Sequence, residues 1–371
     1  MGFRTPADRL LSLDAFRGAT IAAMILVNDA GDWQNTYWPL LHAHWHGWTP
    51  TDLIFPFFVF MMGMSLTFSR RPDARPVLVR AAKLFALGLL VNSWPFLGMD
   101  HLRIPGVLQR IAICYLAAWA AKRWLSPRTQ ALAAALLVAG YWLVMTRVTG
   151  PEGHPPGLEM ETNLSAQVDR ALLRPFLYAR TETWDPEGVL STFPAISTAL
   201  LGLLAGEWLR RGRAPFTTVL GFLATGLALT ATAVCWGEWA PAWLLFPINK
   251  GLWSPSFVLL TAGLASALFG LTYWLVDVHG WRRWAQPCVV YGRNAIALYV
   301  GSELLAGTLG AIRWGTGPDG QPWALYSRIN DVVFGSWLSP VDASLAFALA
   351  TVLLWYLVAR ELDRRGVYFK V

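Results

Sequence analysis

Apolar stretches of helical length recur from one end of the chain to the other, and they restrict its fold more than any other feature. Charged residues make up only 14% of the 371 positions, whereas a typical soluble domain has about 25%. A segment in lipid must bond every backbone N–H and C=O internally, and an α-helix of about 20 residues does so across the hydrocarbon layer. The sequence therefore predicts an all-α polytopic membrane protein, a bundle of about 10 transmembrane helices.

Short polar connections separate these apolar stretches. The predicted bounds of the spans are 10–30, 49–69, 78–97, 105–123, 129–147, 188–209, 215–236, 253–276, 287–310 and 341–360. We expect them to form a single transmembrane domain, 1–371, with a hydrophilic external loop at about 148–187. That loop is too long to be a plain connection, and it could cap an external cavity.

Basic residues cluster in alternate connections between the spans, for example at 70–83, 122–128 and 210–213. Short loops rich in Lys and Arg stay on the cytoplasmic side of a membrane. An even number of spans then puts both termini in the cytoplasm and the 148–187 loop outside, and we predict a bacterial inner membrane as the location. The formal net charge of +7 lies in these short loops, so we expect membrane lipids as partners and no nucleic acid.

Half of the six histidines, His42, His44 and His46, alternate along the loop before the second span. Histidine titrates near neutral pH, so a histidine at the membrane surface suits general acid–base catalysis. In an extended segment the three would share a face and could hold zinc, but no established metal motif accompanies them. We favour acid–base chemistry and predict no bound metal. The three cysteines are too widely separated for a metal or disulfide framework.

Polar side chains within or beside the spans need an explanation, because each is costly in lipid unless it is paired or hydrated. Thr49-Pro50-Thr51-Asp52 is typical of a helix start in which Asp52 bonds back to Thr49, so we favour a structural role for Asp52. Asp14 and Arg17 share a helical face and can neutralise one another. We place the others by depth. At the outer side are Asn28, His42, Asp52, Asn92, Asp100, Arg103, Gln109, Arg110, Glu187, Asn249 and Lys250. Nearer the inner side are Asp14, Arg17, Asp277, Arg293, Asn294 and Glu303.

Motifs in one order over nearly the whole chain resemble those of one family, the membrane-embedded heparan-α-glucosaminide N-acetyltransferases and their bacterial relatives. The segments that carry the resemblance are RLLSLDAFRG (9–18), MILVN (24–28), HAHWHGWTPTDLIFPFFVFMMG (42–63), RIPGVLQRIAICY (103–115), DPEGVLST (185–192), INKGLWSPSFVL (248–259) and YGRNAIALYVGSE (291–303). The chain end, with its penultimate Lys370, is similar as well.

The resemblance implies a transferase that moves an acetyl group from cytoplasmic acetyl-CoA to an amine or hydroxyl of a sugar or glycan on the outer face. The family's catalytic histidine matches His42, rather than His44 or His46, and its partner asparagine matches Asn28. A neutral imidazole could act as general base or carry the acetyl group itself. Asn28 could orient that imidazole or donate to the thioester oxyanion.

The charges suggest where the two substrates bind. Because CoA is strongly anionic, our candidates for the cofactor site are the inner-side residues Arg17, Arg293, Asn294 and Lys370. Our candidates for the acceptor site, an amino sugar or glycan, are the outer-side residues Asp100, Arg103, Gln109, Arg110, Asn249 and Lys250. Arg103 and Arg110 could equally be interfacial anchors.

Two alternatives stay open at this stage. The same polar residues could line the path of a transporter or channel for a sugar or small anion. Small-residue faces that include Gly263 and Gly270 could pack within one subunit or between two, which would make a homodimer.

Overall fold

The computed structural model describes residues 10–69, 73–98, 102–316 and 322–369. Asp100 and Lys370, two of the predicted site residues, lie outside these ranges. The chain divides into two compact units. The first unit comprises Met1–His42, Thr49–Ile54 and Thr272–Val371, and the second comprises Ala43–Trp48 and Phe55–Leu271. The expectation of a single domain stays a prediction.

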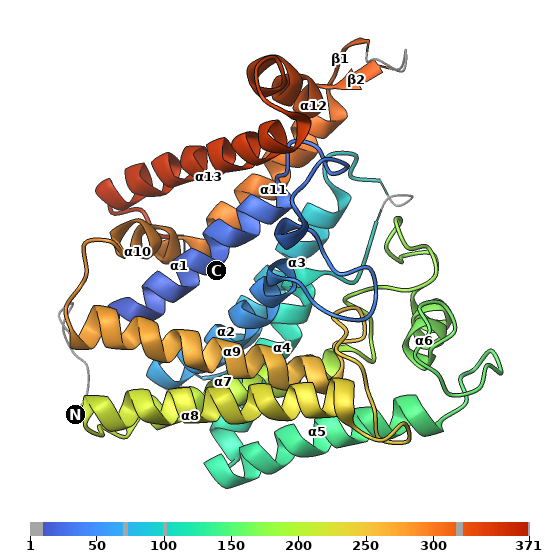
Figure 1. Cartoon of the computed structure of the whole chain (residues 1–371), viewed down its shortest axis with the longest axis vertical. Coiled ribbons are helices and arrows are strands. Elements are labelled where there is room, and N and C mark those ends of the chain that lie inside the picture. Colours follow the sequence, from blue (N-terminus) through green and yellow to red (C-terminus); the bar gives the residue numbers. More distant parts are fainter. Residues whose placement is uncertain (1–9, 70–72, 99–101, 317–321, 370–371) are drawn as a thin grey trace. The chain divides into compact units, whose positions relative to one another are not determined.

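Helices account for nearly all regular structure in the described residues, which confirms the prediction of an all-α polytopic membrane protein (Figure 1). Within the described ranges, seven helices are long and apolar enough to cross a membrane: Leu11–Asn28 (α1), Pro50–Phe68 (η3 and α2), Pro127–Arg147 (α5), Thr192–Arg210 (α7), Pro215–Trp239 (α8 and η5), Pro255–Val278 (α9 and η6) and Pro340–Arg364 (α13). The other three predicted spans are also helical. They are Ala74–Ser93 (α3), Val107–Trp124 (α4), and the pair Gln286–Arg293 (α10) and Ala295–Ala311 (α11).

The span expected at 287–310 is therefore two helices rather than one. The break is at Asn294, whose backbone leaves the helical region with φ −121° and ψ 28°. Its side chain bonds to the backbone of the chain's C-terminal segment, which fixes the residue in this non-helical conformation. Hydropathy does not reveal an interruption of a single residue, because the apolar pattern continues on both sides.

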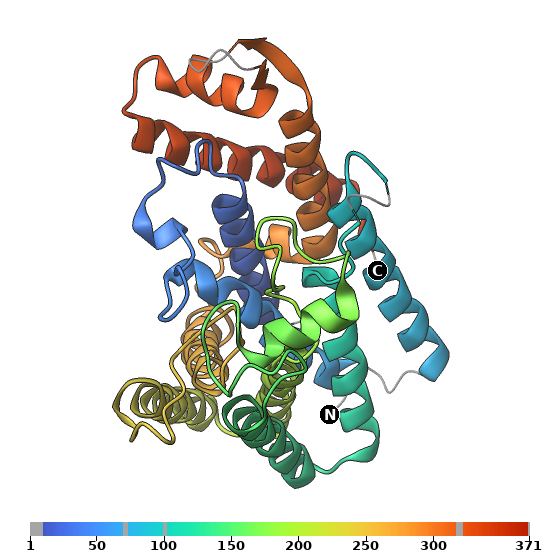
Figure 2. The same cartoon turned by 90° about the vertical axis from the view of Figure 1, so that its right-hand side faces the viewer.

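In the first unit, α1 packs closely on α10 and also contacts α11 and α13 (Figure 1). The close approach depends on glycine, because a Cβ built on Gly18 would lie 1.7 Å from the carbonyl oxygen of Cys288. A Cβ on Gly292 would lie 2.0 Å from the carbonyl oxygen of Asp14. An antiparallel hairpin, Arg313–Thr316 (β1) with Pro322–Ala324 (β2), leads into the short helix Leu325–Asn330 (α12). Figure 2 shows the hairpin, α12 and α13 together in orange and red.

In the second unit, α7 packs against α2, α4 and α5. The α2–α7 contact again needs glycine, since a Cβ on Gly202 would lie 1.9 Å from the carbonyl oxygen of Phe60. Gly263 and Gly270 face α8, where their nearest atoms belong to Gly226, Thr230 and Phe222. These two glycines therefore serve helix packing within one chain, between α8 and α9 (Figure 1).

Basic side chains close the predicted cytoplasmic end of α2. Lys122 donates from Nζ to the carbonyl oxygens of Leu66 and of Ser69, and the latter distance is 2.9 Å. Arg210 Nη1 donates to the Thr67 carbonyl oxygen at 2.7 Å. The last carbonyl groups of a helix have no hydrogen-bond donors within the helix. Lys122 and Arg210, which belong to two of the basic connections, supply donors to the carbonyl groups at this end of α2.

The external loop contains its own helix, Leu164–Leu173 (α6), whose N-cap residue is Asn163. Asn163 Oδ1 accepts a bond from the backbone N–H of Ala166 at 2.9 Å, which satisfies one of the free donors of the first turn. Trp45 donates from Nε1 to the Leu158 carbonyl oxygen at 2.9 Å and fastens the loop. The helix α6 is anchored by a buried hydrophobic cluster, to which its residue Leu164 belongs. The cluster consists of Tyr141, Met145, Leu164, Phe246 and Leu252.

Candidate functional site

The predicted catalytic histidine pairs with a buried carboxylate. His42 Nδ1 lies 2.6 Å from Asp52 Oδ1, with the His42 side chain 50% exposed and that of Asp52 only 1%. Asp52 Oδ2 also accepts the backbone N–H of Thr49 at 3.0 Å, as expected for a helix start. When Asp52 is ionised, Nδ1 carries the shared proton and Nε2 is the basic nitrogen of the ring. This arrangement suits a general base.

Asn28, the last residue of α1, donates from Nδ2 to Glu303 Oε1 at 2.7 Å. The expectation that Glu303 lies nearer the inner side than Asn28 is therefore wrong. Glu303 is well inside α11, so its depth matches the end of α1 rather than the break at Asn294. Asp29 is buried beside this pair, and the Tyr326 hydroxyl donates to the neighbouring Ala30 carbonyl oxygen at 3.0 Å. Because α1 contacts Pro50–Leu53 (η3), the elements that carry Asn28 and Asp52 pack on each other.

Three of the predicted cofactor residues gather where α10 meets α11. Arg17 Nη1 lies 3.4 Å from the Gly292 carbonyl oxygen and 3.5 Å from Asp14 Oδ1. Arg293 Nη1 donates to Asp363 Oδ1 at 2.6 Å.

The third, Asn294, holds the C-terminal segment. Its Nδ2 donates to the Val367 carbonyl oxygen at 3.1 Å, and its Oδ1 accepts the Phe369 N–H at 3.0 Å. This part of the first unit therefore presents two guanidinium groups beside a fixed chain end.

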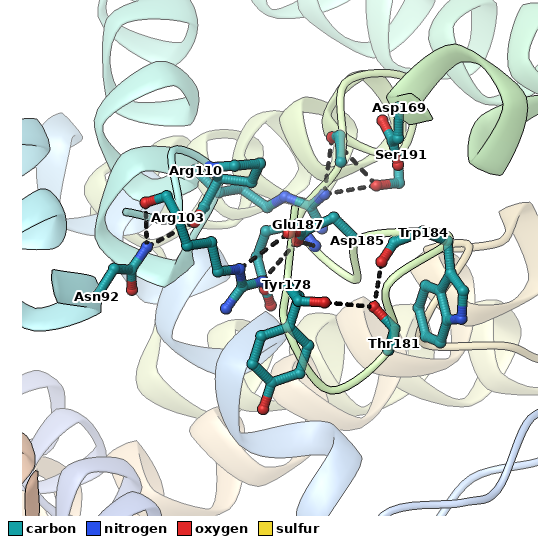
Figure 3. Close-up of polar contacts among 12 residues, drawn as sticks. Asn92, Arg103, Arg110, Asp169, Tyr178, Thr181, Trp184, Asp185, Glu187 and Ser191 are labelled. Carbon is teal, nitrogen blue, oxygen red and sulfur yellow. Dashed lines mark hydrogen bonds and ion pairs between the residues drawn. The ribbon is translucent and has the colours of Figure 1, made fainter. Parts of the chain in front are cut away.

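In the second unit, Arg103 lies at the centre of an ion cluster (Figure 3). Its Nε and Nη2 bond to the two carboxylate oxygens of Asp185 at 2.9 and 2.5 Å, and Nη2 also lies 2.5 Å from Glu187 Oε2. The guanidinium lies over the ring of Tyr178, 4.2 Å from its centre. Asn92 donates to the Arg103 carbonyl oxygen at 3.0 Å. The guanidinium of Arg103 is therefore used mainly in ion pairs that hold the end of the external loop against the segment before α4.

Burial and charge set the pKa values of the carboxyls in this cluster. Burial raises the pKa of Asp185, although Arg103 opposes the shift. Burial would also raise the pKa of Glu187, but the positive charges of Arg103, Arg110 and Lys250 overcome it and hold that pKa below its usual value. Burial raises the pKa of the nearby Asp169 to about 7. The cluster is therefore charged at neutral pH but includes a carboxyl close to its titration point.

Arg110 differs from Arg103 in having unsatisfied donors. It is 1% exposed, and Nη2 donates to the Gly188 carbonyl oxygen at 3.1 Å and to Ser191 Oγ at 2.5 Å (Figure 3). Its Nε and Nη1 have no hydrogen-bond partner among the described residues, and neither have the two amide atoms of the buried Gln109. Buried polar atoms are normally bonded to protein, water or ligand. These atoms are therefore suited to receive a polar group.

Asn249 and Lys250 complete the set of predicted acceptor residues. Asn249 shapes its own turn, since Oδ1 accepts the Leu252 N–H at 2.8 Å, and Nδ2 lies 3.3 Å from His46 Nδ1. Burial lowers the pKa of His46. Lys250 acts electrostatically on Glu187. The second unit thus brings Arg103, Arg110 and Lys250 around Glu187.

Sequence reasoning did not assign Asp52, Asp169, Asp185, Glu187 or Glu303 to the site. Asp185 and Glu187 lie in the DPEGVLST segment, and Glu303 ends YGRNAIALYVGSE, so the motifs contained the signal. In the described part of the chain, no group of three or more His, Cys, Asp or Glu side chains could hold a metal ion. His42 and His46 bond instead to Asp52 and Asn249.

Comparison with known proteins gives a consistent picture. The family described as heparan-alpha-glucosaminide N-acetyltransferase, catalytic, matches residues 9–235. The heparan-alpha-glucosaminide N-acetyltransferase of Homo sapiens is 29% identical over 355 residues, which cover 80% of this chain and 53% of that protein. That of Mus musculus is 28% identical over 370 residues, covering 81% and 54%. The chain thus spans about half the length of these curated relatives.

Proposed function

The chain belongs to the heparan-alpha-glucosaminide N-acetyltransferase family, and from this premise we propose that it transfers an acetyl group from cytoplasmic acetyl-CoA to a sugar. The acceptor is an amine or hydroxyl of a sugar or glycan on the outer face of a bacterial inner membrane. The seven apolar helices of the described residues and the family support a membrane acyltransferase. The donor, the acceptor and the orientation are our proposals.

The observation that carries the mechanism is the 2.6 Å contact between His42 Nδ1 and Asp52 Oδ1. Asp52 holds the imidazole in the tautomer with a basic Nε2 and stabilises the imidazolium that forms. Nε2 removes the proton of the acceptor amine or hydroxyl as the new bond to the acetyl carbon forms. The C–S bond then breaks, and the imidazolium returns the proton to the departing CoA thiolate. In an acyl-histidine relay, Nε2 would attack the thioester first.

Asn28 is proposed to support the same step. One N–H of its amide is held by Glu303, and the second can donate to the thioester oxygen as negative charge develops there. A fixed donor of this kind typically contributes about 10²–10³ in rate.

For the donor, we propose that Arg17, Arg293, Asn294 and Lys370 bind the CoA phosphates. Guanidinium groups bind phosphate well because their planar forks match its oxygens. Arg17 and Arg293 each have an acidic neighbour, Asp14 and Asp363, which keeps them in place without a ligand.

We propose that the acceptor sugar is bound by the residues predicted for this role, which are Asp100, Arg103, Gln109, Arg110, Asn249 and Lys250. Arg110 and Gln109 are the best supported, because buried donor and acceptor atoms on both have no partner among the described residues. Arg103 and Asn249 bond mainly within the protein, so their contribution is to shape the pocket.

The test is acetyl-CoA binding and acetyl transfer by detergent-purified protein. Calorimetry with acetyl-CoA, with CoA and ATP as controls, measures the donor, and labelled acetyl transfer to glucosamine measures the reaction. We expect His42→Ala to bind acetyl-CoA but to lose transfer, whereas His44→Ala, a substitution of an exposed neighbour, keeps both. Full transfer by His42→Ala would refute the mechanism. No acetyl-CoA binding in any lipid mixture, together with sugar counterflow in proteoliposomes, would favour the transporter alternative.

A further inference from the structure

Glu303 places a carboxyl group inside a helix that is otherwise apolar. The helix α11, Ala295–Ala311, has no other charged residue. A carboxyl in such a segment is costly and usually has a functional partner. Its partner is Asn28, 275 positions earlier in the chain, at 2.7 Å. The contact joins two distant segments of the sequence, MILVN (24–28) and YGRNAIALYVGSE (291–303).

The contact defines the orientation of the Asn28 amide. An asparagine side chain can face either way, with its oxygen and its NH₂ exchanged. In the structure the NH₂ group of Asn28 faces Glu303 and donates to its Oε1. The second N–H and Oδ1 of Asn28 then point in fixed directions. Without an acceptor at this place, the two orientations of the amide would be closer in energy.

Other polar groups surround the pair. The titratable groups that the structure places against Glu303 are Asp29, which follows Asn28, and Tyr326 of α12. Asp29 is 3% exposed, and its Oδ2 has no hydrogen-bond partner among the described residues. The Tyr326 hydroxyl donates to the Ala30 carbonyl oxygen, which holds the backbone directly after Asn28 and Asp29. The end of α1 is thus fixed from both α11 and α12.

We propose that Glu303 is a positioning residue for acetyl transfer: its carboxylate holds the Asn28 amide with one N–H directed at the thioester oxygen. This inference rests on the proposed function, because it gives Asn28 its catalytic orientation. A purely structural interhelical hydrogen bond is the alternative, and in membrane proteins such bonds usually contribute little to stability. The two roles differ in what they predict for turnover.

The experiment compares Glu303→Gln with Glu303→Met in the full-length protein. Glutamine keeps an oxygen acceptor at the same reach, whereas methionine keeps the length of the side chain without an acceptor. We expect Glu303→Met to lower kcat about tenfold or more, with little change in the KM for acetyl-CoA, and Glu303→Gln to recover a large part of the loss. Ser302→Ala is the matched control, since the buried Ser302 bonds, among the described residues, to the Tyr299 carbonyl oxygen of its own helix. It should keep the wild-type kcat.

A second comparison tests the path through Asn28. If Glu303 acts by orienting Asn28, the Asn28→Ala/Glu303→Met double variant should be no slower than Asn28→Ala alone. Two results would overturn the inference while the proposed function stands. One is a double variant whose loss in kcat is the product of the two single losses, and the other is a Glu303→Met variant with the wild-type kcat. If Glu303→Met does not fold, Glu303→Gln replaces it in this comparison. The inference is overturned if Glu303→Gln lowers kcat by the same factor in the wild type and in Asn28→Ala. A wild-type protein that transfers acetyl to no sugar acceptor would overturn both proposals.

Discussion

The carboxyl group of Asp52 has two partners at once. One oxygen accepts the Thr49 N–H at the start of η3, and the other contacts His42. The first interaction makes the carboxylate part of the helix end and fixes its position. A group that is fixed in this way can orient an imidazole without losing further conformational entropy. The structural role that the sequence indicates for Asp52 therefore supports the catalytic one.

Asp52→Asn separates the two roles. The asparagine oxygen can still accept the Thr49 N–H, but its NH₂ faces His42 Nδ1 and would force the proton onto Nε2. The base is then in the wrong tautomer, and we expect kcat to fall by about 10²–10⁴ with acetyl-CoA binding unchanged. Asp342→Asn is the control, because Asp342 occupies the same place in the first turn of α13, where it accepts from Ser339 and Tyr37. A wild-type kcat in Asp52→Asn would remove Asp52 from the mechanism.

Asp169 gives the fold a dependence on pH that a single substitution should remove. Burial raises its pKa from 3.8 to about 7, so between these values the folded protein binds a proton that the unfolded chain releases. Stability should therefore fall as the pH rises from about 4 to about 7, by at most about 1.4 kcal/mol per pH unit, and then level off. In Asp169→Asn that slope should be absent, because asparagine does not titrate and keeps the oxygen that accepts the Val189 N–H.

Thermal unfolding across this pH range measures the slope. Asp331→Asn, at an exposed carboxylate, should follow the wild-type curve. Parallel curves for the wild type and Asp169→Asn would show that Asp169 is ionised throughout.

Local motifs predicted His42 and Asn28, but the partners of these residues needed the structure. Asp52 is only ten positions from His42, yet nothing in the sequence states the path of the loop between them. Glu303 is 275 positions from Asn28, and no local pattern indicates a contact over that separation. The expectation grouped Glu303 with Arg293 and Asn294, although Glu303 lies toward the opposite end of the predicted 287–310 span.

At the scale of elements, the external loop is fixed to α4 by a cluster that buries charges. Asp185 and Glu187 are almost fully buried and share Arg103. Removing one member of a buried ion cluster leaves the others without compensation, which typically costs about 3–5 kcal/mol.

We therefore expect Arg103→Met to lower the melting temperature strongly and to expose the 148–187 loop to protease. Arg365→Met, at an exposed pair with Glu361, should change neither, because exposed ion pairs contribute little. An unchanged melting temperature in Arg103→Met would mean that the loop is held by its apolar contacts alone.

The helices themselves were the most predictable elements. Each of the ten predicted spans is helical, one of them as two helices, because a largely apolar segment has few other stable arrangements in lipid. Their packing was less predictable, since it depends on single glycines such as Gly18 and Gly202, where backbones approach too closely for a Cβ. Such positions cannot be told from other small residues by hydropathy.

At the scale of the whole molecule, the proposed roles divide between the two units. The proposed catalytic residues, and the described residues proposed to bind CoA, lie in the first unit, whereas the described residues proposed to bind the acceptor lie in the second. An enzyme that takes its donor and its acceptor from opposite sides of a membrane needs two separate binding surfaces. Each unit carries the described residues of one of these two proposed binding roles.

The orientation of the chain is the last prediction, and it decides whether the reaction can cross the membrane at all. The positive-inside rule puts the α7–α8 connection in the cytoplasm and the 148–187 loop outside. In a variant without Cys114, Cys235 and Cys288, a single cysteine at the exposed Glu161 should react with a membrane-impermeant maleimide in intact spheroplasts. A single cysteine at the exposed Arg211 should react only after permeabilisation. The reverse pattern would put the external loop on the same side as acetyl-CoA, and transfer across the membrane would then be excluded.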